Sequence, residues 1–297
     1  DVPGSDWAKD EARNWAQEAA AGEWGSNVLK IKYGWNGTVD PYLSPLRYNG
    51  QEIGIGNEWW REIGNREQEK EKREQGIWIS VGKIEVAGSK AWSAAKSNYT
   101  YGLGAQGSWG ALWDWSLMKD GRKYNSLPEQ QKEALHKRGI FGFDILVGPE
   151  LAVDVMARQH ASNVNKPYSF DVGADILAVA GASLQFGGKK TAYRLRYMIR
   201  TNLIGADFVP EYWQSMYEVA EGQWKGDIRC SGPWNRNVVR QELTMDFQFI
   251  RSTWRLGVEH EWMNYRRAME WNRQEVRIVV GCVWKYKIDG KGIRNKE

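Results

Sequence analysis

Long stretches of the chain alternate between apolar and polar residues with a period of two. In residues 170–186 every even position is apolar: Phe170, Val172, Ala174, Ile176, Ala178, Ala180, Ala182, Leu184 and Phe186. The odd positions include Asp171, Gly173, Asp175, Ser183 and Gln185. This period predicts a β-strand with two different faces. At ~3.3 Å per residue the strand would span about 55 Å, which is longer than most strands of globular proteins.

The same alternation returns in residues 29–35, 191–203, 253–263 and 275–288. One face of each segment is apolar and carries Trp or Tyr, while the other carries Lys, Arg or Glu. A soluble β-sandwich also alternates, but its strands are usually short. Aromatic residues at the ends of long strands are expected where a barrel meets the two membrane interfaces. The pattern therefore favours a transmembrane barrel over a sandwich.

We predict an all-β fold: a transmembrane antiparallel up-and-down β-barrel of about ten strands, preceded by a short N-terminal periplasmic helix. The strand cores are expected at residues 27–36, 50–61, 76–87, 99–117, 139–157, 169–186, 191–205, 238–249, 253–264 and 274–288. Both chain ends in the periplasm make the strand number even. Twelve strands are the alternative, if residues 206–237 contain a further hairpin around Trp213–Val219.

The predicted organisation has three parts. Residues 1–25 form the N-terminal helical segment, with the helix at 5–21; residues 26–290 form the barrel, and residues 291–297 form a polar C-terminal tail. Asp6 could cap the helix and Gly22 stands where it would stop.

Connection lengths predict which end of the barrel faces outward. The joins at 187–190 and 250–252 are tight, as periplasmic turns usually are. The longer connections at 37–50, 88–98, 158–168 and 205–237 are assigned to the cell exterior. The charged join at 62–75 is expected to be a solvated turn or flap.

Composition agrees with a barrel better than with a soluble domain. Charged residues make up 26% and the mean hydropathy is −0.64, but 18 Trp, 13 Tyr and 32 Gly are distributed along the chain. Barrels have this profile because only alternate positions meet lipid. No stretch approaches the roughly 18 consecutive apolar residues of a membrane-spanning helix. The net charge of +4 is spread over the chain and does not indicate nucleic-acid binding.

The sequence shows no constellation of catalytic or metal-binding residues. The three histidines are His136 in a charged connector, His160 at the start of a loop, and His260 on the apolar face of its strand. A catalytic serine needs a histidine base within hydrogen-bond reach, and no Gly-x-Ser-x-Gly elbow is present. The two cysteines, Cys230 and Cys282, fit no metal-ligand spacing. We therefore expect no enzymatic activity, no cofactor and no metal.

Charged residues on the polar strand faces are expected to point into the lumen. Carboxylates there, such as Glu259 and Glu261, would pair with lumenal arginines; the expected lumenal charge network comprises Arg194, Arg196, Arg200, Arg255, Glu259 and Glu261. Side chains nearly fill a barrel of about eight strands, so this network is expected to plug the lumen. The alternative is a narrow pore whose charged lining selects solutes.

Aromatic residues in two outer loops are candidates for partner docking, because Tyr and Trp are enriched in interfaces. The candidates are Tyr42, Leu43, Pro45 and Tyr48 in the first loop, and Tyr212, Trp213 and Tyr217 in the segment 205–237. The alternative is that these loops fold over the barrel mouth and pack on each other.

Several motifs resemble the DUF3316 family of outer-membrane β-barrel proteins of Bacteroidota. The most specific is 40–50, DPYLSPLRYNG, directly after a strand that ends in Tyr33-Gly34-Trp35. Residues 163–167 resemble the family's asparagine- and proline-rich loop, 208–218 its proline-tyrosine loop, and 254–258 its penultimate strand. The resemblance covers roughly 27–288. It implies a barrel in the outer membrane but no activity, because the family is known only as a domain of unknown function.

Two functions are compatible with the sequence. The first is a non-catalytic structural or partner-docking subunit of a larger outer-membrane assembly, such as export or barrel-insertion machinery. Its partners would be the lipid bilayer and other outer-membrane proteins or lipoproteins, with no nucleic acid involved. The alternative is a small porin or transport channel for solutes.

Overall fold

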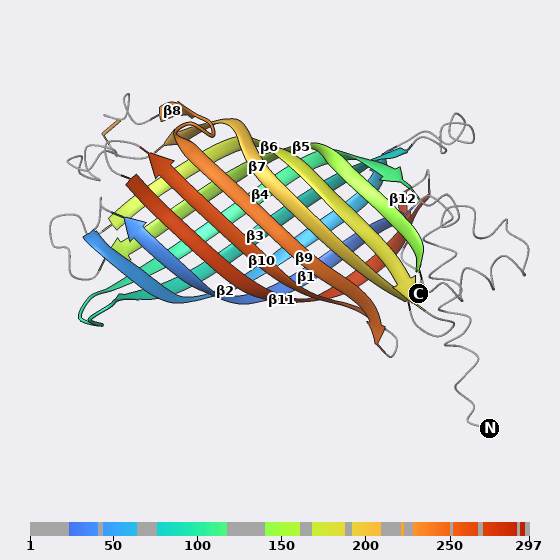
Figure 1. Ribbon diagram of the computed structural model, residues 1–297, viewed down its shortest axis with the longest axis horizontal. Helices are drawn as coiled ribbons and strands as arrows, with labels where there is room; N and C mark the ends of the chain where they lie inside the picture. Colours follow the sequence, from blue (N-terminus) through green and yellow to red (C-terminus); the bar gives the residue numbers. More distant parts are fainter. Residues whose placement is uncertain are drawn as a thin grey trace, which may run out of the picture.

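The protein folds as a closed antiparallel β-barrel in the computed structural model (Figure 1). The structure describes residues 24–40, 44–63, 76–117, 140–160, 168–187, 192–208, 221–222, 228–249, 252–266, 270–289 and 292–294. The long strands are β1 (Trp24–Asp40), β2 (Ser44–Ile63), β3 (Ile77–Ser93), β4 (Tyr99–Ser116), β5 (Ile140–His160), β6 (Tyr168–Gly187), β7 (Ala192–Phe208), β9 (Arg236–Phe249), β10 (Ser252–Arg266) and β11 (Glu270–Asp289).

Each long strand pairs with the next one, and β1 pairs with β11 to close the barrel. The closing ladder runs from Trp24 opposite Lys287 to Val39 opposite Asn272. The prediction of ten barrel strands is confirmed. Two short strands lie outside the ring: β8 (Ile228–Ser231) pairs with β7, and β12 (Gly292–Arg294) pairs with β11. β8 lies in the segment where the twelve-strand alternative required a hairpin, and it does not insert between β7 and β9.

The antiparallel order divides the connections between two ends. The terminal end, where β1 begins and β11 ends, also carries the connections β2–β3, β4–β5, β6–β7 and β9–β10. The opposite end carries the other connections and is called the loop end below. Closure matters because a barrel pairs its backbone groups without leaving a free strand edge.

Two of the predicted long loops are largely strand and a third has strand at both of its ends, which corrects the sequence prediction. Within the stretch 37–50, β1 continues to Asp40 and β2 begins at Ser44. Likewise 88–98 is mostly β3, and 158–168 contains the end of β5 and the start of β6. The charged join 62–75 and the long connection between Ser116 and Ile140 lie at the terminal end, together with the tight joins. Connection length therefore does not separate the two ends.

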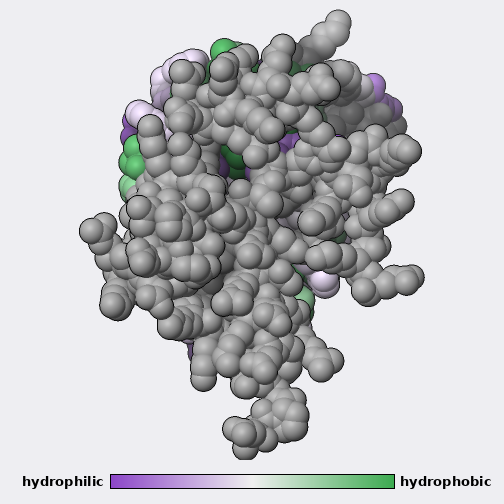
Figure 2. Space-filling view, turned by 90° about the vertical axis from the view of Figure 1, so that its right-hand side faces the viewer, coloured by the Kyte–Doolittle hydropathy of each residue, from purple (hydrophilic) through white to green (hydrophobic). Residues whose placement is uncertain are grey.

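The outer wall is apolar and the interior is polar. Outward residues such as Ile53 and Leu103 are 63% and 62% exposed, whereas inward Lys30 and Arg255 are 0% and 1% exposed. Seen from the end with the termini, hydrophobic residues are visible at several places along the edge of the molecule and also nearer its centre (Figure 2). This inversion of the usual globular arrangement is the one that lipid requires.

Aromatic side chains mark both ends of the outer wall. At the terminal end, Trp78 packs edge-on against Trp113, with ring centroids 5.3 Å apart. At the loop end, Tyr99 and Tyr101 pack in the same way at 5.4 Å. Aliphatic residues occupy the wall between the two ends, as expected for a membrane band flanked by aromatic girdles.

Among the described residues, no helix is long and apolar enough to cross a membrane. The helix expected at 5–21 lies outside the described residues. The predicted polar tail, 291–297, contains β12.

Candidate functional site

The lumen is filled by charged side chains from every part of the barrel. The buried or nearly buried cations are Lys30, Lys32, Lys83, Arg194, Arg196, Arg200, Arg236, Arg240, Arg255, Arg273 and Arg277. The carboxylates are Glu52, Glu58, Glu85, Glu150, Asp154, Asp175, Asp207, Glu242, Asp246, Glu259, Glu261 and Glu275. Cations and carboxylates are close to balance, which a water-poor interior needs because an isolated buried charge is very costly.

Arg255 joins strands on opposite parts of the wall. Its Nε and Nη2 donate to the two carboxylate oxygens of Asp246 on β9, at 2.6 and 3.0 Å. Its Nη1 donates to Oε1 of Glu58 on β2, at 2.6 Å. In the ring, β11 and β1 lie between β10 and β2, so the Glu58 contact bridges the lumen rather than following the wall.

The lysines of β1 form a second set of bridges. Lys30 pairs with Glu58 and lies 3.4 Å from Oε1 of Glu242 on β9. Nζ of Lys32 is 2.5 Å from both Oε2 of Glu259 on β10 and Oε1 of Glu85 on β3. Lys32 therefore holds two strands that are not neighbours of β1, while Lys30 connects the neighbouring β2 with the more distant β9.

A third set of bridges connects β5 with β7 and β9. Arg200 donates through Nε to Oε2 of Glu150 at 2.9 Å and through Nη1 to Oε2 of Glu242 at 3.3 Å. Arg240 donates through Nη2 to both carboxylate oxygens of Asp154, at 2.8 and 2.9 Å. Charge-assisted pairs of this kind are the strongest hydrogen bonds available to side chains.

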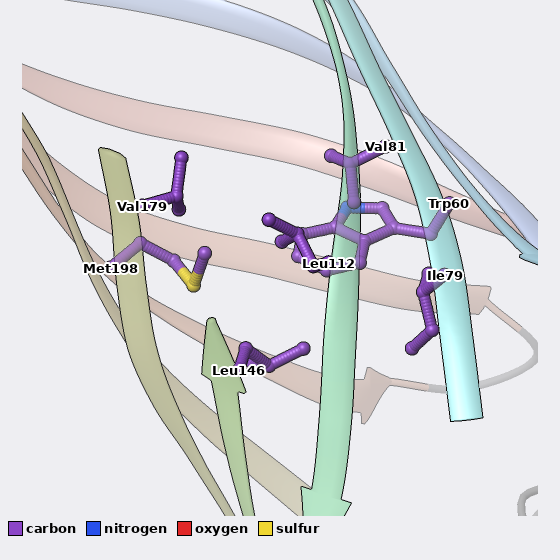
Figure 3. Packing of buried hydrophobic residues seen from close by; sticks show 7 residues of the cluster. All are labelled: Trp60, Ile79, Val81, Leu112, Leu146, Val179 and Met198. Carbon is purple, nitrogen blue, oxygen red and sulfur yellow. The ribbon is translucent and has the colours of Figure 1, made fainter. Parts of the chain in front are cut away.

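An apolar cluster, absent from the sequence prediction, occupies the lumen in the half nearer the terminal end. Its residues are Trp60, Ile79, Val81, Leu112, Leu146, Val179 and Met198. They come from β2, β3, β4, β5, β6 and β7 and point toward one another across the interior (Figure 3). The guanidinium of Arg196 lies over the Trp60 ring at 4.0 Å and connects this apolar cluster to the charged network.

A cavity of about 100 Å³ lies in the half nearer the loop end. Its wall includes a second group of buried residues, Val238, Met263, Tyr265 and Trp271, of which the last three line the cavity directly. Inward positions on the opposite wall are held by Gly54, Ala87, Gly104 and Gly173. These residues have little or no side chain to fill the space, which accounts for the cavity.

The residues predicted for the lumenal network all lie in the interior. Arg194, Arg196, Arg200, Arg255, Glu259 and Glu261 are 1–9% exposed. Glu259 contacts Lys32, while Glu261 lies 3.5 Å from Nε of Arg240. The alternation of the sequence placed these side chains inward, whereas their partners on β1, β2 and β5 were not predicted.

The docking prediction needs one correction. Tyr48 is not a loop residue: it lies in β2, is 3% exposed, and its hydroxyl is 2.6 Å from Nε2 of His160 inside the barrel mouth. Even positions of β2 face inward, and this places Tyr48 there. The other candidates, Tyr42, Leu43, Pro45, Tyr212, Trp213 and Tyr217, have side chains outside the described residues.

The histidines that the structure describes do not share a site. His160 ends β5 and packs against Tyr48, with ring centroids 5.3 Å apart. His260 lies on the outer face of β10, where its Nε2 is 3.3 Å from the amide nitrogen of Gln274. In the described ranges, no three His, Cys, Asp or Glu residues are grouped so that they could hold a metal ion.

Comparisons with known proteins identify a family. The model of the family described as Protein of unknown function (DUF3316) matches residues 26–268. No curated protein matches the chain.

Several solved barrels are similar. The transport unit of the autotransporter AIDA-I from Escherichia coli is 7% identical; the match covers 92% of this chain and 98% of that one, with a TM-score of 0.39. The translocator domain of the autotransporter NalP from Neisseria meningitidis is 11% identical, with 94% and 97% covered and a TM-score of 0.38. OccK7 (OpdD) from Pseudomonas aeruginosa is 8% identical, with 89% and 100% covered and a TM-score of 0.24.

Proposed function

The chain belongs to the DUF3316 family, and because that family is defined without an activity, we propose a function from the barrel itself. The protein is an outer-membrane barrel without catalytic activity that serves as a structural or partner-docking subunit of a larger outer-membrane assembly, such as export or barrel-insertion machinery. Its outward apolar wall supports the membrane location. Its filled lumen supports a role other than solute diffusion.

The observation that carries this proposal is the double obstruction of the lumen. Ion pairs such as Arg255–Glu58 and Arg200–Glu150 bridge strands that are not neighbours. The apolar cluster around Trp60 obstructs the same path nearer the terminal end. A hydrated ion would have to break bridging pairs and pass an apolar constriction, and both steps carry a large free-energy penalty. A barrel with such an interior is suited to hold a surface in the membrane.

Single-channel recording in planar bilayers tests the obstruction. We expect no reproducible conductance steps from the purified wild-type protein. Trp60→Ala combined with Leu112→Ala should remove part of the apolar cluster and the contacts of Trp60 with Glu58 and Arg196, while the ion pairs of the charged network keep both of their partners. The matched control is Trp284→Ala with Val280→Ala, which removes similar side chains from the outer wall. Stable ion conduction by the wild-type barrel would contradict the proposal and indicate the small-channel alternative.

Purification under mild conditions tests the docking role. We expect stoichiometric outer-membrane partners to copurify from cells after gentle detergent extraction. Tyr212→Ala with Trp213→Ala should reduce their recovery if the segment 205–237 carries the docking surface. Recovery of a lone monomer under several mild conditions would contradict a subunit role while leaving the membrane location untouched.

A further inference from the structure

The cavity near the loop end has the chemistry of a ligand site. Its lining includes aromatic and thioether side chains, with Tyr265 and Trp271 directly opposite each other on β10 and β11. Met263 lies on the same wall. A concave, mainly apolar surface with a few polar groups is the usual form of a small-molecule site.

The charged residues of the cavity wall are already paired with one another. Arg158 donates to Oδ2 of Asp171 at 2.5 Å, and Arg236 donates to Oδ2 of Asp175 at 2.6 Å. Arg277 donates to Oε1 of Glu52 at 2.6 Å. An ionic ligand would have to displace one of these partners and leave a buried charge unpaired. The wall therefore favours an uncharged ligand.

Several other polar atoms around the cavity lack a hydrogen-bond partner among the described residues. They include Nε1 of Trp271, Oδ2 of Asp207 and Oδ1 of Asn36, and each of these three belongs to a side chain that is less than one-tenth exposed. Asn36 lines a smaller adjoining cavity of about 40 Å³, which shares Met156, Arg158 and Arg273 with the main one. Buried polar groups are normally satisfied, so a ligand that supplies both donors and acceptors would complete this site.

We propose that this cavity binds one neutral sugar unit that enters from the loop end. A sugar ring has hydroxyls at its edge and C–H groups on its faces, which can pack on Tyr265 and on the part of the Trp271 ring that the Arg158 guanidinium, 5.0 Å from the ring centroid, leaves uncovered. A hydroxyl can accept from Nε1 of Trp271 and donate to the oxygens of Asn36 and Asp207. At roughly 10–15 Å³ per water-sized probe, the main cavity of about 100 Å³ holds about seven to ten such probes, so a hexose, with its 12 non-hydrogen atoms, would extend into the adjoining cavity of about 40 Å³. The inference does not depend on the docking role.

Ligand-observed saturation-transfer NMR and calorimetry test the proposal on the full-length barrel. The protein is held in an amine-oxide detergent, because maltoside and glucoside head groups would compete. The probes are glucose, galactose, mannose and N-acetylglucosamine, with glucosamine and glucuronic acid as charged analogues and cyclohexanol as an apolar one. We expect saturable binding of at least one neutral sugar and at least tenfold weaker binding of its charged analogue.

Two variants assign that binding to the cavity. Trp271→Phe keeps the aromatic face but removes the indole N–H, and should weaken sugar binding about three- to tenfold, the range for one hydrogen bond. Ala87→Leu fills the cavity and should abolish binding. The matched controls are Trp284→Phe and Ala180→Leu, because both residues lie on the exposed outer wall. Heat-modifiable migration on gels verifies that each variant forms a barrel.

The outcomes are distinct. Absence of binding by every neutral sugar overturns the proposal, as does equal loss of binding in cavity and outer-wall variants. Binding of cyclohexanol alone also overturns it, because the site would then be an apolar pocket. Sugar binding by a barrel that shows no conductance would agree with both proposals. Conductance by a barrel that binds no sugar would contradict both, because conductance tests the obstruction of the lumen and binding tests the sugar site.

Discussion

Among single residues, Arg255 shows how the interior is held. It is 1% exposed, and its guanidinium donates to the buried carboxylates of Asp246 and Glu58 on other strands. The planar guanidinium can engage Asp246 with two parallel hydrogen bonds and still reach Glu58 with a third. Lysine could not reproduce this geometry, because its ammonium is a point charge. The arginine therefore couples β9, β10 and β2 through one side chain.

Removing Arg255 should be strongly destabilising. Arg255→Met leaves Asp246 buried without its bidentate partner, and losing one member of a buried ion pair usually lowers the free energy of unfolding by about 3–5 kcal/mol. The double variant Arg255→Met with Asp246→Leu removes both charges and should recover part of the loss. Urea unfolding in lipid vesicles measures both values. A double variant no more stable than the single one would contradict this explanation, because the loss would then not come from the unpaired Asp246 carboxylate.

The face of each residue could be predicted, but its partner could not. Alternation places Arg200 and Glu259 inward whatever the rest of the barrel does. Which carboxylate meets which arginine depends on how the strands stagger around the ring, and no local pattern encodes that. The sequence gives only a weak indication of apolar residues in the lumen. Leu177 and Val179 are apolar at inward positions of β6, where the surrounding inward residues are polar or small.

At the scale of strands, hydrogen bonding continues beyond the apolar band. β2 begins at Ser44, well before its first outward aliphatic residue, Ile53, which has Gln51 and Asn49 ahead of it. Polar outward residues are solvated there, yet the ladder to β1 persists as far as Val39 opposite Arg47 and, after a shift in register, Asp40 opposite Ser44. The outward residues change from apolar to polar where the wall passes from lipid to water, and the strand continues beyond that point. This is why the strand number was predicted correctly and three loops were predicted too long.

The ladder between β4 and β5 contains an interruption that depends on glycine. Pairing stops after Gly110 opposite Glu150 and resumes at Trp113 opposite Val147. Pro149, in the gap, has no N–H to donate. A Cβ on Gly148 would lie 2.2 Å from the carbonyl oxygen of Ala111. The strands approach so closely here that only glycine fits.

Two glycine substitutions should therefore differ in sign. Gly148→Ala forces the two strands apart and should lower the free energy of unfolding by about 1–3 kcal/mol, as overpacking usually does. Gly107→Ala on β4 has no atom within 4 Å of the new methyl group and should be neutral or stabilising by up to about 1 kcal/mol. Urea unfolding of both variants makes the comparison. Equal destabilisation would contradict the close approach at Gly148.

For the molecule as a whole, the two halves of the lumen differ along the barrel axis. The apolar cluster occupies the half nearer the terminal end, and the main cavity occupies the half nearer the loop end. Charged bridges lie between them. A solute entering from the loop end would reach the cavity and stop, whereas entry from the terminal end meets the apolar cluster first. This asymmetry fits a receptor-like mouth better than a passage, provided that the loop end faces the cell exterior.

The two native cysteines can establish that orientation. Cys230 is exposed on β8 at the loop end, opposite Ala206 of β7, and Cys282 lies on the outer wall of β11. A membrane-impermeant maleimide should label intact cells at Cys230. The terminal end is predicted to lie in the periplasm, and the loop end lies on the opposite side of the membrane. Cys230→Ser should abolish the labelling and Cys282→Ser should leave it unchanged, since lipid shields that thiol from a charged reagent. Labelling of Cys230 only after the outer membrane is permeabilised would place the loop end in the periplasm and direct the sugar-binding mouth inward.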